Sequence, residues 1–126
     1  MGISTVGKDL MLQRLGGITA TAINSMGVGS SNTAFAATQT ALQGTYTALQ
    51  ALDAGSPTEA SEVLTCTCTF STSEGNLNGG ASAWEEIGLF NGTTNGTSTM
   101  FNRIVIPAIT KTSAISIVAV IQITQS

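Results

Sequence analysis

The sequence predicts an all-β protein, an antiparallel β-sandwich of jelly-roll-like type with a short N-terminal helix or arm. Three observations predict it. From residue 18 onward, short segments alternate apolar and polar residues. Turns rich in glycine and asparagine separate roughly six such segments. The only helical spacing of apolar residues lies near the N-terminus. The 126 residues suit one domain, with a helix or arm at 1–17 and a sandwich at 18–126.

A helix is expected over residues 5–17, where apolar residues recur at helical spacing and a glycine pair ends the pattern. A helix of about ten residues is marginal alone. Its apolar side must therefore pack on the sandwich or on another subunit. We take Leu10, Met11, Arg14 and Leu15 as the candidate interface residues.

The next segments alternate with period two. A strand is expected over 18–28, closed by a turn at 27–32. The stretch 33–52 is ambiguous, because its alanines and leucines tolerate a helix whereas residues 44–47 favour a strand. We expect a loop followed by a strand.

The clearest strand runs from Val63 to Phe70, with its apolar residues on one face and three threonines on the other. A second strand is expected from Trp84 to Phe90. Alternation places Trp84, Glu86, Gly88 and Phe90 on one of its faces.

Two strands are expected near the C-terminus. The first runs from Met100 to Ile106 and ends at Pro107. The second runs from 113 to 124 and aligns its isoleucines on one face. Because its other face carries Val118 and Val120, we expect this strand to lie centrally between two layers.

The composition disfavours several function classes. The chain has four Lys and Arg, seven Asp and Glu, a net charge of −3 and no His. Four scattered basic residues cannot neutralise a run of phosphates, and the commonest acid–base residue and metal ligand is missing. The longest apolar stretch is too short to span a membrane, and no signal peptide is evident. We expect no nucleic-acid, membrane or small-molecule partner, no cofactor and no metal.

Two motifs suggest chemistry but have simpler explanations. Cys66-Thr-Cys68 has the wrong spacing for a metal or redox pair, and strand alternation places both thiols on the apolar face. We interpret them as small core residues. The glycines of 27–31 lack the lysine of a phosphate-binding loop, which favours a tight turn.

The remaining motifs also favour structural roles. Glu85 and Glu86 should point to opposite faces, one toward solvent and the other capping a loop or reaching a neighbouring subunit. No pair of carboxylates is selected for catalysis, so we expect no enzyme and no catalytic residue. The Asn-Gly-Thr repeats at 91–97 favour hairpin turns over glycosylation. Trp84 and Phe90 favour the core over a carbohydrate platform.

Three segments, in order, resemble motifs of small virion proteins of tailed phages. Met26-Gly-Val-Gly-Ser-Ser-Asn-Thr-Ala34, with Thr40-Ala-Leu42, resembles their "AVGTGTTAP…TAL" opening. Glu86-Ile-Gly-Leu-Phe-Asn91 resembles "EVGLFN". Phe101-Asn-Arg-Ile-Val-Ile-Pro-Ala-Ile-Thr-Lys-Thr112, with the terminal strand, resembles "ARTVFPPITKT…LTITWTITIS". The chain departs from the family at Gln43-Gly44, where an acidic residue is frequent, and at Val120 and Ile121, where a Trp is frequent.

The resemblance implies a non-enzymatic virion structural protein with a jelly-roll-like sandwich. Its most direct expectation is a capsid decoration, or cement, protein that binds the outside of a phage shell as trimers and stabilises it. The partners would be the major capsid protein and further copies of the chain, with residues 1–17 packing on one of them. The alternative is a tail-fibre or baseplate domain that contacts other tail proteins or host-surface glycans. A non-viral adhesin would need an export route.

Overall fold

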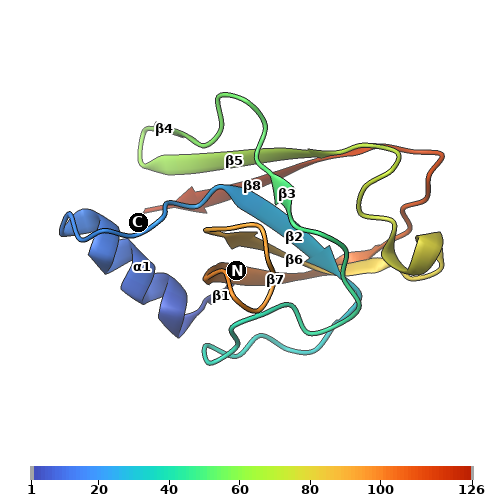
Figure 1. Cartoon of the computed structure of the whole chain (residues 1–126), viewed down its shortest axis with the longest axis horizontal. Coiled ribbons are helices and arrows are strands. Elements are labelled where there is room, and N and C mark those ends of the chain that lie inside the picture. The colour runs from blue at the N-terminus through green and yellow to red at the C-terminus, as the bar shows by residue number, and fades with distance from the viewer. Residues whose placement is uncertain (1, 126) are drawn as a thin grey trace.

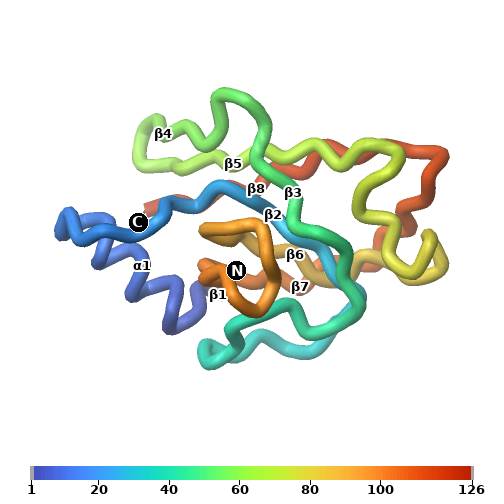
Figure 2. Tube along the Cα trace, viewed as in Figure 1, coloured from blue at the N-terminus to red at the C-terminus, as the bar shows by residue number. Residues whose placement is uncertain are grey.

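Two antiparallel sheets form a β-sandwich, with the single helix packed at one end (Figures 1 and 2). The computed structural model describes residues 2–125, so positions 1 and 126 of the two expected segments lie outside it. The predicted all-β sandwich is confirmed. Its elements are β1 (Gly2–Ile3), α1 (Thr5–Leu15), β2 (Ser25–Gly29), β3 (Gln50–Ala51), β4 (Thr58–Ala60), β5 (Val63–Phe70), the 3-10 turn η1 (Leu77–Gly80), β6 (Trp84–Phe90), β7 (Met100–Ile109) and β8 (Ile117–Thr124).

The sheets are unequal. One has five strands in the order β1-β7-β6-β2-β3, and the other has three in the order β4-β5-β8. Their facing sides enclose the main core, which includes Met26, Val28, Cys66, Cys68, Phe70, Leu77, Trp84, Ile87, Leu89, Phe101 and Ile121. Several of these residues come from strands far apart in the chain, so the core ties both halves of the sequence together.

The start of the chain belongs to the sandwich. β1 pairs with β7, and the Ser4 hydroxyl caps α1 by accepting from the Gly7 N–H at 2.9 Å. The same hydroxyl donates to the Met100 carbonyl at 2.6 Å. A Cβ at Gly7 would lie 2.1 Å from the Phe101 carbonyl oxygen, so the close approach of α1 to β7 requires glycine here. The helix ends at Leu15, before the glycine pair, as predicted.

The two clearest strand predictions have the observed bounds, Val63–Phe70 for β5 and Trp84–Phe90 for β6. β7 runs three residues past its expected end at Ile106. It passes Pro107 because the pairing shifts there, from Val105 opposite Glu86 to Ile109 opposite Trp84. A proline is tolerated at such an irregularity, where a ladder hydrogen bond is already lost.

Because of this register shift, the side chain of Trp84 does not lie on the face of β6 that alternation predicts. Its ring packs edge-to-face on Phe70, with centroids 4.9 Å apart, in the core between the sheets. Glu86 and Phe90 lie on the other face of β6. Strict alternation was therefore wrong for Trp84, although Trp84 and Phe90 are both buried core residues, as predicted.

Two predictions in the first half need correction. The strand expected over 18–28 is limited to Ser25–Gly29, and the glycines expected in a turn lie inside it. They fit a strand because side chains lie against them: Leu49 beside Gly27 and Glu86 beside Gly29. The segment 33–52 is mainly loop, as expected, but its strand has only the two residues of β3.

The central position expected for the last strand is also wrong. β8 begins at Ile117 rather than 113 and pairs only with β5, at the edge of the smaller sheet. Ile117, Ala119, Ile121 and Ile123 face the core, as predicted. Val118 and Val120 are 60% and 55% exposed because nothing within residues 2–125 forms a layer over that face, and Ile115 is exposed ahead of the strand.

Candidate functional site

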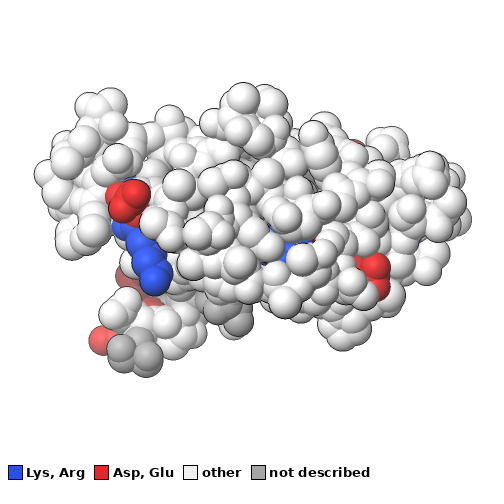
Figure 3. All heavy atoms as spheres, turned by 90° about the horizontal axis from the view of Figure 1, so that it is seen from below, with Lys and Arg blue, Asp and Glu red and all other residues white. Residues whose placement is uncertain are grey.

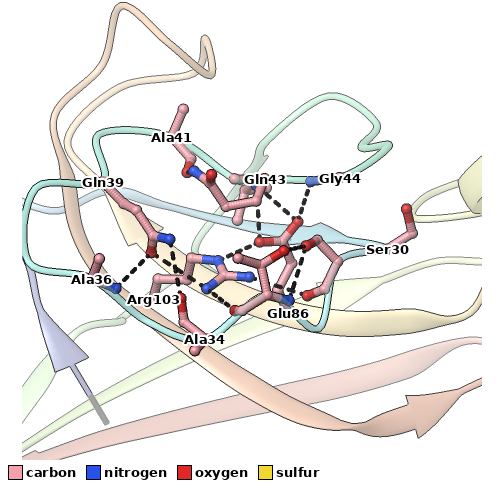
Figure 4. Close-up of polar contacts among 12 residues, drawn as sticks. Ser30, Ala34, Ala36, Gln39, Ala41, Gln43, Gly44, Glu86 and Arg103 are labelled. Carbon is pink, nitrogen blue, oxygen red and sulfur yellow. Dashed lines mark hydrogen bonds and ion pairs between the residues drawn. The ribbon is translucent and has the colours of Figure 1, made fainter.

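An ion pair lies buried on the outer face of the five-stranded sheet (Figure 4). Arg103 Nε on β7 lies 2.5 Å from Glu86 Oε2 on β6, and neither side chain is exposed. The Glu86 carboxylate also accepts the backbone N–H groups of Gln43, at 3.0 Å, and Gly44, at 2.8 Å. Glu86 therefore caps a loop, one of the two roles expected for this acidic pair.

Arg103 fixes the same loop from its other side. Its guanidinium donates to the Thr33 carbonyl at 2.7 Å and to the Ser31 carbonyl at 3.1 Å. A longer bond of 3.4 Å reaches the Gln39 side-chain oxygen, which also accepts from the Ala36 N–H. One ion pair thus holds both ends of the segment 31–44, which has no regular secondary structure.

Glycine makes room for this network. A Cβ at Gly29 would lie 2.3 Å from Glu86 Oε1, and one at Gly44 would lie 2.6 Å from the Ser31 backbone nitrogen. Beside the ion pair, Leu42 and Leu49 from the covering segment pack on Phe90 and Met100 as a second small core. The segment 31–49 therefore forms a layer on the outer sheet face, and the chain then enters the sheet at β3.

The three motifs that carry the phage resemblance meet in this network. Gly29 to Thr33 and Leu42 come from the first motif, Glu86 opens the second, and Arg103 lies in the third. Lys111, also in the third motif, is buried and donates to the Asn76 side-chain oxygen at 2.8 Å. Within this chain, Glu86 and Arg103 from these segments hold the loop 31–44 onto the sandwich.

Sequence reasoning missed the partnership of Glu86 with Arg103. The signal was present, because Arg103 is the one charge in its strand and the strand of Glu86 is apolar or uncharged apart from Glu85 and Glu86. A charge buried in such a strand needs a partner. In the structure the two groups bind each other and the backbone of the segment 31–44, and both are buried from solvent, so their arrangement serves to hold that loop.

Cys66 and Cys68 are free thiols buried in the main core. Burial raises the pKa of Cys66 to about 11. Burial, with the charges of Asp53 and Glu74, raises the pKa of Cys68 to about 12. Both thiols stay protonated at neutral pH, which agrees with their interpretation as small core residues.

The four candidate interface residues divide into two groups. Leu10 is 4% exposed and packs on the chain itself, whereas Met11 is 44% and Leu15 is 85% exposed. Arg14 is exposed and donates to the Ala20 carbonyl at 2.9 Å. Leu12 and Ile18, which are not among the four candidates, are 66% and 60% exposed.

An apolar hollow of about 530 Å³ lies beside α1. Three of the four candidate residues line it, Leu10, Met11 and Arg14. The opposite wall comes from both sheets and the chain after α1, and includes Ile23, Leu64, Phe101 and Ile123. Exposed Met11, Leu12, Leu15 and Ile18, with this hollow, form what we call the α1 surface.

Charged side chains are unevenly distributed. On the face drawn in Figure 3 they gather mostly at the α1 end, and the remaining surface is nearly free of them. Lys8, Asp9 and Arg14 lie on α1, and Glu59 and Glu62 line the hollow. Most of the sandwich therefore presents uncharged atoms to solvent.

Residues 2–125 contain no group of three or more His, Cys, Asp or Glu placed to hold a metal ion. Within that range, no helix has the length and apolar character needed to cross a membrane. Comparisons with protein-family models, with curated proteins and with solved structures find no match for this chain.

Proposed function

We propose that this chain is a non-enzymatic structural subunit of a phage virion. In this proposal it is a decoration, or cement, protein that binds the outside of the capsid shell as trimers. A protein that binds the assembled shell better than free shell subunits shifts the equilibrium toward the assembled state. The partners are the major capsid protein and other copies of this chain.

The α1 surface is the observation that carries the proposal. Four large apolar side chains are exposed along and just after one short helix, beside an apolar hollow. Exposed apolar residues scattered singly need no explanation, but a cluster of them favours an interaction site. The start of the helix is anchored to β7 by β1, Ser4 and Gly7, so this surface is already formed in the single chain. We assign the α1 surface to the shell.

The charge distribution supports a multicopy assembly. Burying a charge at an interface costs free energy unless it finds a partner. A sandwich that gathers most charges of one face at the α1 end can pack closely against neighbours over the rest of that face. The convergence of the three phage-like motifs on one buried network gives a second support, because these residues act together in this chain.

A binding experiment with shells tests the assignment. Purified chain is sedimented with shells that lack it, and the bound fraction is measured against concentration. We expect saturable binding by the wild type and at least tenfold weaker binding by Leu15→Lys. Burial of a leucine contributes roughly 1.5–3 kcal/mol, and about 1.4 kcal/mol corresponds to tenfold in affinity.

The matched control is Thr72→Lys, an exposed position in the loop between β5 and η1. This loop lies at the end of the sandwich opposite α1 (Figure 1). The control should bind like the wild type. Equal binding by Leu15→Lys and the wild type would contradict the assignment of the α1 surface, and no binding by the wild type would contradict the cement function.

A further inference from the structure

β8 has an open backbone edge. It pairs with β5 on one side, and no strand of residues 2–125 pairs with its other side. The strand has eight residues and regular register throughout. At about 3.4 Å per residue this edge is roughly 27 Å long. Such a row of unpaired N–H and C=O groups is a template for another strand.

The other sheet edges carry features that hinder pairing with a strand of another chain, and the β8 edge does not. β4 has three exposed residues, among them Glu59, and β3 has only two. The free edge of β7 is covered by β1 at 102–103 and interrupted farther on by Pro107. β8 has the sequence IVAVIQIT, with no charge, no proline and no bulge. Natural sheets use those devices to prevent edge-to-edge contact with another chain. β8 has none of them, so it is the strand edge least protected against contact with another copy.

The sandwich is also open between the edges of β7 and β8. An apolar groove of about 350 Å³ lies there, with Ile106 and Ile109 on the β7 flank and β8 on the other flank. Ile109 is 40% exposed, and Val118 and Val120 are more exposed still. The two flanks differ in sequence and shape but share their apolar, uncharged character.

We propose that this groove is where copies of the chain join, with the β8 edge of one copy packed against the β7 flank of the next. A closed trimer needs two different patches on each subunit, and the two flanks of one groove provide adjacent, unlike patches. Neither flank carries a charge, so identical copies meet without like-charge repulsion. This inference rests on the trimeric assembly of the proposed function, and it leaves the α1 surface free for the shell.

The test is the molar mass of the purified chain in solution, measured by light scattering after size exclusion. We expect a trimer for the wild type. Val120→Lys on one flank and Ile109→Lys on the other should each lower the mass threefold, to that of a single chain. A buried lysine without a partner is costly, whereas Val120 is exposed enough in the single chain for the variant to fold. Val118→Lys gives a second variant on the β8 flank, and circular dichroism checks that each variant is folded.

Leu15→Lys is the control, because it adds the same charge on the α1 surface, and it should remain a trimer. A wild-type monomer would overturn the inference, and so would a dimer. A trimer that Leu15→Lys dissociates and Val120→Lys does not would also overturn it, since copies would then join through α1.

The failure of this inference is distinguishable from failure of the proposed function. A chain that is monomeric in solution yet binds shells saturably would overturn the β8 contact and leave the cement function standing. A trimer that Val120→Lys dissociates, but that binds no shell, would overturn the cement function and support the β8 contact.

Discussion

Arg103 Nε lies 2.5 Å from Glu86 Oε2, and both side chains are fully buried between the five-stranded sheet and the segment 31–44. Through this contact, two charges hold a loop that has almost no backbone pairing of its own. The pair is surrounded by backbone N–H and carbonyl groups that satisfy its remaining hydrogen bonds.

The ion pair gives the first prediction. Glu86→Gln keeps the shape of the side chain but leaves the Arg103 charge buried without a counter-ion. Removal of one partner from a buried pair costs about 3–5 kcal/mol, and we expect a loss of this size in the free energy of unfolding. Urea unfolding measures it through the fluorescence of Trp84, the single tryptophan, which is buried in the native state.

The neighbouring residue provides the control for this prediction. Glu85 is half-buried, and Arg103 pairs with Glu86 rather than with Glu85, so Glu85→Gln should change the free energy of unfolding by less than about 0.5 kcal/mol. Equal losses in the two variants would mean that the Glu86–Arg103 contact does not stabilise the fold.

Gly29 gives the second prediction. A Cβ here would meet the Glu86 carboxylate at 2.3 Å, so Gly29→Ala must displace that carboxylate or β2. We expect a loss of about 1–3 kcal/mol in the free energy of unfolding, as for overpacking in a core. Gly16→Ala serves as the comparison, because Gly16 has a φ of −80° and its Cβ would have only the Leu12 carbonyl nearby. A milder effect at Gly29 than at Gly16 would contradict the role given to Gly29.

How far the sequence predicted this structure depended on how local each signal was. β5 and β6 follow from alternation within a few residues, and their bounds were predicted correctly. The edge position of β8 could not be predicted, because an apolar residue on both faces looks the same whether a second layer or solvent covers it. The face of Trp84 depends on a register shift opposite Pro107, which is set by the partner strand.

The candidate site residues also divide into those predicted from local sequence signals and those whose contacts depend on strand pairing. Met11 and Leu15, predicted from the helical spacing of apolar residues, are exposed on α1 with Arg14 of the last turn, whereas Leu10 from the same spacing is buried against the sandwich. Glu86 and Arg103 are 17 positions apart, and their contact depends on the β6–β7 register. That register is a property of the folded sheet.

The buried thiols give the third prediction, a loss of stability at alkaline pH. Folding raises the pKa of Cys66 from 9.0 to about 11 and that of Cys68 from 9.0 to about 12. The unfolded chain therefore releases these protons first as the pH rises, which favours unfolding. The contribution is fully present below pH 9 and is lost between pH 9 and about 11–12. Urea unfolding at a series of pH values measures it.

The double variant Cys66→Ala, Cys68→Ala isolates this effect, because it lacks both thiols and should show a shallower loss over the same pH range. A slope identical to that of the wild type would contradict the assignment to the cysteines. Independently, a thiol reagent at pH 8 should modify neither cysteine in the folded chain and both in urea.

The two assembly surfaces give the fourth prediction, a separation of functions. Leu15→Lys should weaken binding to shells and leave the trimer intact, because the α1 surface lies apart from the β7–β8 groove. Val120→Lys should dissociate the trimer without unfolding the chain. Sedimentation with shells and light scattering measure the two effects on the same samples. A single variant that abolishes both would indicate one shared surface.

The stoichiometry of the chain in purified virions tests the central claim most directly. Mass spectrometry against the major shell protein measures it. The cement function predicts a ratio near one, or a large simple fraction of one, because a decoration protein covers the whole shell. A few copies per particle would contradict it and favour a tail-fibre or baseplate location, and absence from the particles would contradict a virion function altogether.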